Sequence, residues 1–491
     1  MIPQGASGLA FAHRAKRLCL ICGLLGLLAP SGLLADWRAA QEASVLNGVQ
    51  AVLMCNGLFT SGRSLTQVYD QELKYLSPPR FRSALGDANG GPYRVDQANR
   101  SVIVGTDNPE QQVAAVYQPG FGCIVLAPGE LPTAEVVAEL PVYPAIESER
   151  LASATVAAGG LEARDVSAEF DPAALAAAAD WVFDRPFEEQ VTVSLLVTYQ
   201  GQVVLERYAP GFDSTTRTRT WSTAKGLAAI LIGMLVDEGA LVLDEPLAAD
   251  WLPALNESQQ DPRRRITLRH ALTMSTGLEP VDNNRQEYKS GSGLAYWAGD
   301  SSSVGARARG LVRDPGTYWD YENYDTLLAV NAMKQAIGKE VEYWRFPAQR
   351  LLNKLGMDRT VLSVDRQGDF ILSSQVYTNA RDLAKIGQLL LNDGVWAGER
   401  LLSSKWIAFM RSPANIPNNP RGQYGGQWWL VPKDRDDVPK DAFSAAGSRG
   451  QFLIVVPSKD LVIVRRGLDF GRRPMSQWDL TREILKAWSA S

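Results

Sequence analysis

The sequence predicts an α+β fold in which an antiparallel sheet is flanked by helices and carries an inserted all-helical lobe. Strand-like runs at residues 191–209 and 451–467 enclose a stretch, about residues 266–391, in which apolar residues recur with helical spacing. A chain that passes from strands to helices and back to strands places the helices as an insertion in one sheet. We expect this lobe at about residues 245–410, and a small α/β extension ahead of the sheet.

Length and composition are those of a globular protein with more than one domain. The chain has 491 residues, of which 45% are hydrophobic and 21% are charged. Such a length suggests about two or three domains. The net charge of −4 gives no electrostatic basis for binding nucleic acid, and no basic run interleaved with aromatic residues occurs. We therefore expect no nucleic-acid partner.

Residues 1–35 have the pattern of a signal peptide. Arg14, Lys16 and Arg17 precede the apolar run LCLICGLLGLLAPSGLLA, and the small residue Ala35 ends it. The alternative is a retained membrane anchor, but glycines and Pro30 interrupt the run. The expected location is therefore periplasmic or secreted, after cleavage of the signal peptide.

Two cysteines, Cys55 and Cys123, remain after the signal peptide. In an oxidising compartment such an even pair suggests a disulfide. Two buried free thiols are the alternative, and either arrangement would be structural rather than catalytic.

Residues 36–150 form the N-terminal extension, to which the sequence assigns no chemistry. The segment DWRAAQEASVLNGVQAVLMC predicts a short helix, and YRVD, RSVIVGT and QVAAVYQ predict strands. The stretch LASATVAAGGLEARD indicates a linker at residues 151–170. The extension could dock a partner or associate with the cell envelope, and nothing in its residues indicates an oligomeric state.

Residues 171–491 form the second unit, which begins with a helix over DPAALAAAADWVFD. Asp171 is its expected cap and Pro172 lies in its first turn. Two β-rich runs about Gln200-Gly201 predict a hairpin. The apolar helix after it is expected to stop at Gly239. A last helix over SQWDLTREILKAWS follows the C-terminal strands.

Several catalytic chemistries are excluded by the residue inventory. The chain has two histidines, His13 in the predicted signal peptide and His270, which lies in the helix-like ITLRHALTM and is not expected to serve a catalytic triad. No G-x-S-x-G elbow, usual zinc set or Gly-rich phosphate loop occurs. We therefore expect no metal and no organic cofactor.

Chemistry based on a serine and a lysine remains. The pattern S-x-x-K occurs once, at Ser222 and Lys225 in WSTAKG, ahead of a long apolar helix. Residues three apart share one helix face, and a helix N-terminus favours negative charge on a serine oxygen. A lysine desolvated between two lobes can lose its proton and accept one from the serine. The alternative is an ordinary helix start with a solvated lysine.

A tyrosine would supply a second proton-transfer group. Of two Y-x-N triplets, Tyr321 and Asn323 lie in a Pro-Gly loop that opens a helix, where the tyrosine should be exposed and rigid. In the other, Tyr377 and Asn379, the asparagine is the expected cap of the next helix. We therefore favour Tyr321.

An acyl-transfer site also needs donors for the oxyanion. The backbone N–H of Ser222 is one, and the strand entry SAAGSRGQFLIVVP is the best source of the other. Gly447 and Gly450 let the backbone approach a ligand there. A simple glycine-rich hairpin entry is the alternative.

These residues resemble the serine β-lactamase and penicillin-binding-protein superfamily, and within it the class C-like branch with its esterases and the 6-aminohexanoate-dimer hydrolase type. The resemblance covers about residues 171–491 and rests on WSTAKGLAAILIGMLVDEGALVLDEPL, ITLRHALTMSTGLE, DPGTYWDYENYDTLLA, ARDLAKIGQLLLNDGVWAGERLL and GSRGQFLIVVPSKDLVIV. It implies a β-lactamase/D,D-peptidase-like fold. It also implies Ser222 as the acylated nucleophile, Lys225 as its base, Tyr321 as the second proton-transfer group and Asn323 as a donor to the substrate.

The third motif of that superfamily, Lys- or His-x-Gly, departs from its pattern in this chain. AAGSRGQF puts Ala445 at the cation and Gly447 at the glycine, which makes the backbone N–H of Ser448 the second oxyanion donor. Gln451 is the alternative if the register slips by three residues. The missing cation normally helps to hold a substrate carboxylate, and Arg449 lies nearby but alternates differently along the strand. The departure favours a simpler amide or ester over a β-lactam or a stem peptide.

The sequence therefore predicts an exported serine hydrolase that cleaves a small amide or ester through an acyl-enzyme on Ser222, similar to 6-aminohexanoate-dimer hydrolases and esterases. The alternatives are a β-lactamase or peptidoglycan D,D-peptidase, and a non-catalytic ligand-binding or sensor protein on the same scaffold. The loop at residues 283–303 would carry specificity, and its Tyr288 and Tyr296 could line the cleft or simply pack.

Overall fold

The structure is a computed structural model that describes residues 31–76, 81–145, 169–254, 258–281, 288 and 291–488. Nearly all of the predicted signal peptide, residues 1–35, and of the predicted linker, residues 151–170, lies outside the described residues. Helix α1 (Ser31–Cys55) includes the last five residues of the predicted signal peptide.

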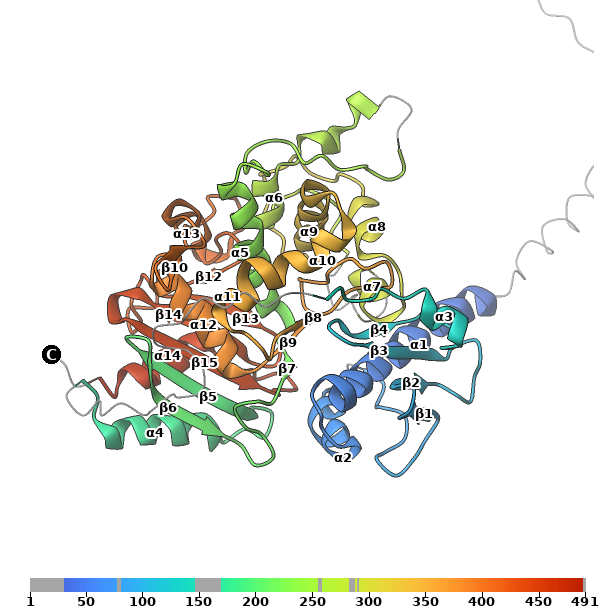
Figure 1. Ribbon diagram of the computed structural model, residues 1–491, viewed down its shortest axis with the longest axis horizontal. Coiled ribbons are helices and arrows are strands. Elements are labelled where there is room, and N and C mark those ends of the chain that lie inside the picture. The colour runs from blue at the N-terminus through green and yellow to red at the C-terminus, as the bar shows by residue number, and fades with distance from the viewer. Residues whose placement is uncertain are drawn as a thin grey trace, which may run out of the picture.

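A six-stranded antiparallel sheet organises the second unit (Figure 1). Its strand order is β12-β13-β14-β15-β5-β6, so that the first strands of this unit pair with its last ones. The members are β5 (Thr192–Tyr199), β6 (Gln202–Tyr208), β12 (Trp429–Leu430), β13 (Phe443–Gly447), β14 (Gln451–Val456) and β15 (Leu461–Gly467). The helical insertion thus leaves and rejoins one sheet, which confirms the predicted fold class.

Helices cover both faces of this sheet (Figure 1). On one face α4 (Pro172–Phe183) and α14 (Gln477–Leu485) close an apolar layer of their own. On the other face lie α12 (Ala380–Leu391) and α5 (Ala224–Asp237), the latter against β13. Strands β5, β14 and β15 are therefore buried on both sides, which is why they read as nearly continuous apolar runs.

The local signals at the ends of these elements act as predicted. The Asp171 carboxylate caps α4 by accepting from two backbone N–H groups, and Pro172 is the first helical residue. Gln200 and Gly201 both have positive φ, 50° and 75°, as a two-residue hairpin turn with right-handed twist requires. Gly239, with φ of 76°, follows the end of α5.

The helical lobe lies between β6 and β12 in the sequence and packs over the end of the sheet that carries β13 (Figure 1). Its helices are α6 (Leu268–Leu272), α7 (Ser292–Trp297), α8 (Ser302–Arg307), α9 (Asn323–Ile337), α10 (Glu340–Pro347), α11 (Asn353–Leu355) and α13 (Ser404–Met410). Its short strands are β7 (Thr218–Arg219), β8 (Val361–Leu362), β9 (Val376–Thr378), β10 (Val395–Trp396) and β11 (Glu399–Arg400). Helix α9 packs directly against α5, which brings the lobe to the start of the S-x-x-K helix.

The N-terminal unit is an antiparallel sheet packed on α1. Its strands are β1 (Tyr93–Asp96), β2 (Ser101–Val104), β3 (Val113–Gln118) and β4 (Gly122–Val125), in the order β1-β2-β3-β4. Cys55, at the end of α1, forms a disulfide with Cys123 in β4. After α1 comes a compact run of helical turns, residues 56–75, that includes α2 (Leu65–Gln67), and α3 (Ala134–Ala138) follows the sheet.

Within the described residues, one segment, Gln41–Thr60, is long and apolar enough to cross a membrane. Of its most apolar window 83% is buried inside the protein, which is typical of a core helix.

The N-terminal unit and the second unit share one hydrophobic core. Gly48 of α1 lies against the backbone of Trp297 in α7, where an added Cβ would come within 1.6 Å of the carbonyl oxygen. Only glycine permits this approach. The N-terminal unit is therefore packed into the body of the protein.

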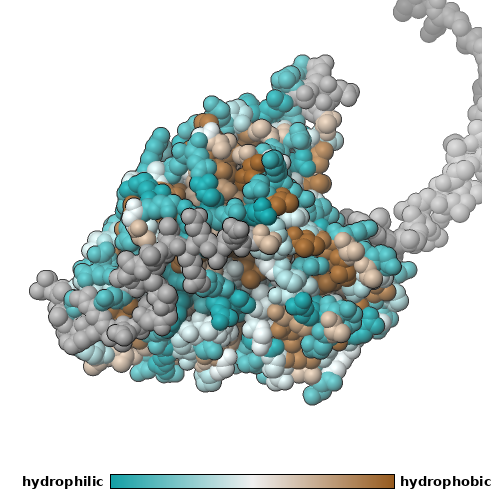
Figure 2. Space-filling model, viewed as in Figure 1, coloured by the Kyte–Doolittle hydropathy of each residue, from teal (hydrophilic) through white to brown (hydrophobic). Residues whose placement is uncertain are grey.

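The surface of the protein, seen from the same side, is largely hydrophilic, and its apolar residues lie in separate groups (Figure 2).

Candidate active site

Ser222 lies in a tight turn between β7 and α5. The turn comprises Trp221–Thr223, and Ser222 is half-buried at its centre. Trp221 has φ of 50°, an unusual value for a residue with a side chain. Its indole ring is covered by the Arg219 guanidinium at 3.7 Å from the ring centroid. The turn places Ser222 just before the start of α5, and a helix N-terminus stabilises negative charge.

Hydrogen bonds from Arg466 hold the backbone that leads to this turn. Its guanidinium donates to the carbonyl oxygens of Thr218, Arg219 and Thr378, and to the side chain of Gln451. Burial lowers the pKa of Arg466 to about 9. The Arg466 guanidinium therefore links the strands β7, β9 and β14 close to the Ser222 turn.

Lys225 lies one helical turn after Ser222 and is only 1% exposed. Its Nζ donates to Ser222 Oγ at 3.3 Å, to Asn323 Oδ1 at 2.6 Å and to the carbonyl oxygen of Ser373 at 2.8 Å. The ammonium is thus held by neutral oxygens from three separate parts of the chain. The structure places Ser222 beside Lys225, as the S-x-x-K spacing predicted, and brings Asn323, which the resemblance implied, to the same ammonium.

Asn323 and Tyr321 come from the loop that opens α9. Glu322 caps that helix, accepting from the backbone N–H groups of Tyr324 and Val281. Asn323 is the first helical residue and also donates to Ser292 Oγ at 3.3 Å. The Tyr321 ring centroid lies 4.9 Å from Lys225 Nζ. Contrary to expectation Tyr321 is half-buried rather than exposed, because three aromatic rings pack on it: Trp319, Tyr424 and Trp429.

The competing candidates have structural roles. Tyr377 is buried in β9, and burial raises its pKa. Asn379 caps α12 by accepting from Asp382 N, as expected. His270 belongs to the cap of α6, where its Nδ1 accepts from the backbone N–H of Thr267 at 3.1 Å.

Gly447 is the point at which the edge of the sheet contacts the Ser222 turn. β12 pairs with β13 only at Phe443 and Ser444, so the rest of the β13 edge lies next to the Ser222 turn. An added Cβ at Gly447 would lie 2.9 Å from Ser222 N. Ser448 follows directly and is exposed.

Gln451, the alternative oxyanion donor, lies on the interior strand β14. Its carbonyl oxygen accepts from Thr223 Oγ1, and its side chain donates to the Gly467 carbonyl oxygen. The edge position of Gly447 therefore favours Ser448 over Gln451 as the donor.

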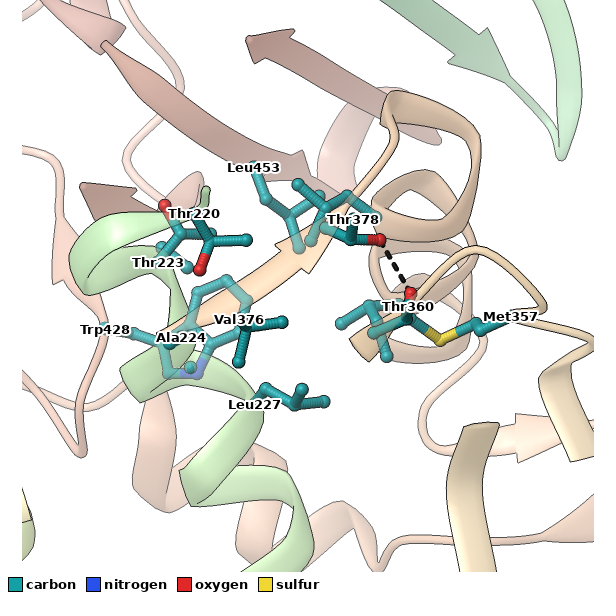
Figure 3. A pocket seen from close by; sticks show the side chains of 14 residues that line it. Thr220, Thr223, Ala224, Leu227, Met357, Thr360, Val376, Thr378, Trp428 and Leu453 are labelled. Carbon is teal, nitrogen blue, oxygen red and sulfur yellow. Dashed lines mark hydrogen bonds between the residues drawn. The ribbon is translucent and has the colours of Figure 1, made fainter. Parts of the chain in front are cut away.

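Ala445 lines an apolar cavity between the sheet, α5 and α12. The Ala445 residue is 2% exposed. A Cβ added at Gly226 would lie 2.9 Å from both the Ala445 Cβ and the Trp428 ring, so these three residues are in close contact. The cavity wall is mostly apolar; its lining includes Thr220, Thr223, Ala224, Leu227, Met357, Thr360, Val376, Thr378 and Leu453 (Figure 3). A cation at this position would have to be buried beside Trp428, which gives a physical reason for the alanine.

Arg449 does not replace the missing cation. It is 5% exposed and paired with Glu72 of the N-terminal unit at 2.8 Å. Tyr288 and Tyr296, which could line the cleft or pack, are both buried. The Tyr296 hydroxyl is hydrogen-bonded to Ser373 Oγ, beside the carbonyl that holds Lys225. Residues 283–287, 289 and 290 of the predicted specificity loop lie outside the described residues.

Sequence reasoning missed Ser373, Arg466 and Glu72. Ser373 acts through its backbone carbonyl, which carries no sequence signal. Arg466 and Glu72 act through contacts distant in sequence that only the fold reveals. Across the described ranges, no group of three His, Cys, Asp or Glu side chains is arranged to hold a metal ion.

A family model described as Beta-lactamase matches residues 183–465, more than half of the chain. The chain belongs to the beta-lactamase family. Its members are serine hydrolases, so the predicted resemblance is confirmed at that level. The N-terminal unit lies outside the matched residues.

One curated relative and two solved structures are similar to this chain. The 6-aminohexanoate-dimer hydrolase of Paenarthrobacter ureafaciens is 28% identical over 298 residues, covering 57% of this chain and 74% of the relative. A penicillin-binding protein homologue from Caulobacter crescentus has a similar structure, with a TM-score of 0.50 at 18% identity over 64% of this chain and 97% of that one. A class C beta-lactamase gives a TM-score of 0.50 at 16% identity over 67% and 100%. The two solved structures support the fold alone.

Proposed function

We propose that this chain is an exported serine hydrolase that cleaves an amide or ester through an acyl-enzyme on Ser222. The observation that carries the proposal is the contact of Lys225 Nζ with Ser222 Oγ at 3.3 Å, in a buried network next to a sheet edge. The basic and apolar segments of residues 1–35 support export, and so does the disulfide between Cys55 and Cys123.

Lys225 acts as the base when its amine is neutral. Burial disfavours the charged form of a lysine. Two of its N–H groups then remain on Asn323 Oδ1 and the Ser373 carbonyl, and its lone pair faces Ser222 Oγ. The Ser222 proton passes to Nζ as Oγ bonds to the substrate carbonyl carbon.

The carbonyl oxygen becomes an oxyanion between the backbone N–H groups of Ser222 and Ser448. The contact of Gly447 with the Ser222 turn supports this arrangement, because it brings the two backbones together. Tyr321, beside Lys225, delivers a proton to the leaving amine or alcohol as its bond to carbon breaks. Water then attacks the acyl-enzyme and gives a proton to the Tyr321 phenolate, while Lys225 returns its proton to Ser222 Oγ. This releases the acid and restores the Ser222 hydroxyl, the neutral Lys225 amine and the Tyr321 hydroxyl.

The substrate class we propose is a small amide or ester whose recognition does not depend on a cation at position 445. Two observations favour it over a β-lactam. The relative from Paenarthrobacter is a hydrolase of an amide-linked dimer by name, and Ala445 is enclosed beside Trp428. Asn323 is the expected donor to the substrate, since its side chain borders Lys225.

Labelling with a fluorophosphonate probe tests the proposal. Intact and peptide-level mass should show one adduct, on the Ser222 peptide, and Ser222→Ala should show none. Ser448→Ala is the matched control, because it keeps the backbone N–H and should still be labelled. Absence of an adduct on folded wild-type protein would exclude an activated Ser222. Turnover of esters, ω-amino-acid oligomers and nitrocefin then separates the substrate classes.

A further inference from the structure

The N-terminal unit reaches the two turns that carry the proposed oxyanion donors. Its helical turns at residues 56–75 contact Arg449, directly after Ser448, and Trp221, directly before Ser222. These turns lie outside the part of the chain that the family model matches. They therefore add an element to the site that the matched domain does not contain.

Arg449 is the first point of contact. Its Nη1 donates to Glu72 Oε2 at 2.8 Å and its Nη2 to the Gln71 carbonyl at 2.7 Å. It also donates to the carbonyl oxygen of Glu72, and to those of Leu468 and Asp469 in the second unit. The guanidinium thus joins the hairpin that follows β13 to residues 71–72.

Glu72 supplies the charge that allows Arg449 to be buried. It is 3% exposed and also accepts from Arg63 Nη2 at 2.8 Å. Burial alone would raise the pKa of Glu72, but attraction by Arg63 and then Arg449 outweighs it, so that the pKa is lowered. The carboxylate is therefore ionised and fixed between the two arginines.

Tyr75 is the second point of contact. Its ring centroid lies 5.5 Å from that of Trp221 and 5.1 Å from Cζ of Arg449. Trp221 and Arg449 have φ of 50° and 63°, values that cost free energy in residues with side chains. Such backbones persist only where surrounding contacts hold them. The Tyr75 ring packs against the side chains of both residues.

We propose that residues 56–75 position the oxyanion hole, with Glu72 and Tyr75 as positioning residues that hold Arg449 and Trp221. The inference rests on the proposed function of Ser222 and Ser448. Oxyanion donors act by being fixed before charge develops, so a small displacement lowers the rate without weakening substrate binding.

The Tyr75→Leu variant tests the ring contact, with Phe81→Leu as control. The Phe81 ring packs on Tyr75 and Tyr288 in the same aromatic cluster, one step away from Trp221. Tyr75→Leu should lower kcat on an activated ester about 10- to 100-fold with KM unchanged. The affinity of a boronic acid transition-state analogue should fall by the same factor. Phe81→Leu should leave both near wild type, and Tyr75→Phe should recover most of the rate.

The Glu72→Gln variant tests the charge contact, with Glu130→Gln as control. Glu130 pairs with Arg366, so it also joins the N-terminal unit to the second unit, but away from the proposed hole. Glu72→Gln should lower kcat and boronic acid affinity together, whereas Glu130→Gln should not. Tyr75→Leu decides the matter if Glu72→Gln does not fold, since it leaves no buried charge unpaired.

The outcomes separate the two proposals. Wild-type kcat in folded Tyr75→Leu, an equal loss in the Phe81 or Glu130 control, or a change confined to KM would overturn the positioning role. Wild-type protein that is not labelled at Ser222 would instead overturn the proposed function itself.

Discussion

Replacing Gly447 by alanine should separate the sheet edge from the nucleophile turn. The added Cβ would lie 2.3 Å from the carbonyl oxygen of Thr220, and 2.9 Å from the backbone nitrogens of Ser222 and Thr223. All three are backbone atoms, so no flexible side chain can move aside. Ordinary contact begins at 3.4 Å, and the edge must therefore move by about 1 Å.

A displacement of that size should lower kcat/KM roughly 100-fold. The loss approaches that of removing one oxyanion donor, which costs about 2.7–4 kcal/mol of transition-state stabilisation. The assay is the second-order rate of fluorophosphonate labelling, together with ester hydrolysis and the melting temperature. Gly310→Ala is the control, because its Cβ would meet nothing within 4 Å. A folded Gly447→Ala protein with wild-type rates would refute the placement of the oxyanion hole at this edge.

Three further perturbations follow from the structure. Lys225→Met should lower kcat roughly 10²- to 10⁴-fold in steady-state ester hydrolysis, because the proposed base is lost. Burial first, and then the charge of Arg269, lower the pKa of His270 below its usual 6.5, so the folded state disfavours the protonated ring. The contribution of His270 to the free energy of unfolding should therefore be fully present above about pH 6.5 and be lost as the pH drops below that value. His270→Gln, which preserves the cap, should not show this loss. Urea denaturation of both proteins at about pH 5 and about pH 7.5 checks the difference. The double substitution Cys55→Ser and Cys123→Ser should reduce the free energy of unfolding by about 4 kcal/mol, because the disulfide joins residues 68 apart; an unchanged denaturation midpoint would contradict this.

The parts of the fold that the sequence predicted are those coded by neighbouring residues. The Asp171 cap, the turn at Gln200-Gly201 and the stop at Gly239 depend on atoms within a few positions of each other. The same is true of the contact between Ser222 and Lys225, since one helical turn separates them.

The parts that could not be predicted depend on contacts distant in sequence. Tyr321 was expected to be exposed, but residues 424 and 429 bring their rings onto it across about a hundred positions. The salt bridge from Glu72 to Arg449 spans an even larger separation, and it joins the N-terminal unit to the second unit, whose contact the sequence did not predict. Neither periodicity nor motif spacing contains such information.

Ala445 lies between these two cases. The sequence shows that an alanine replaces the cation of the superfamily, but only the packing shows why. The side chain at this position faces Gly226 and the Trp428 ring on the buried side of the sheet, so a cation there would lose its water without gaining a carboxylate from this wall of the cavity.

The buried cations around the proposed site are held in two different ways, and the difference bears on mechanism. Arg449 lies against the Glu72 carboxylate, which fixes its charge and makes it a structural support. Lys225 Nζ is held by the hydroxyl of Ser222, an amide oxygen and a backbone carbonyl. The amide oxygen of Asn323 and the carbonyl oxygen of Ser373 accept hydrogen bonds from an amine and from an ammonium alike, so they position the nitrogen in both protonation states. That is the property a base needs if it is to take a proton from Ser222 and later return it.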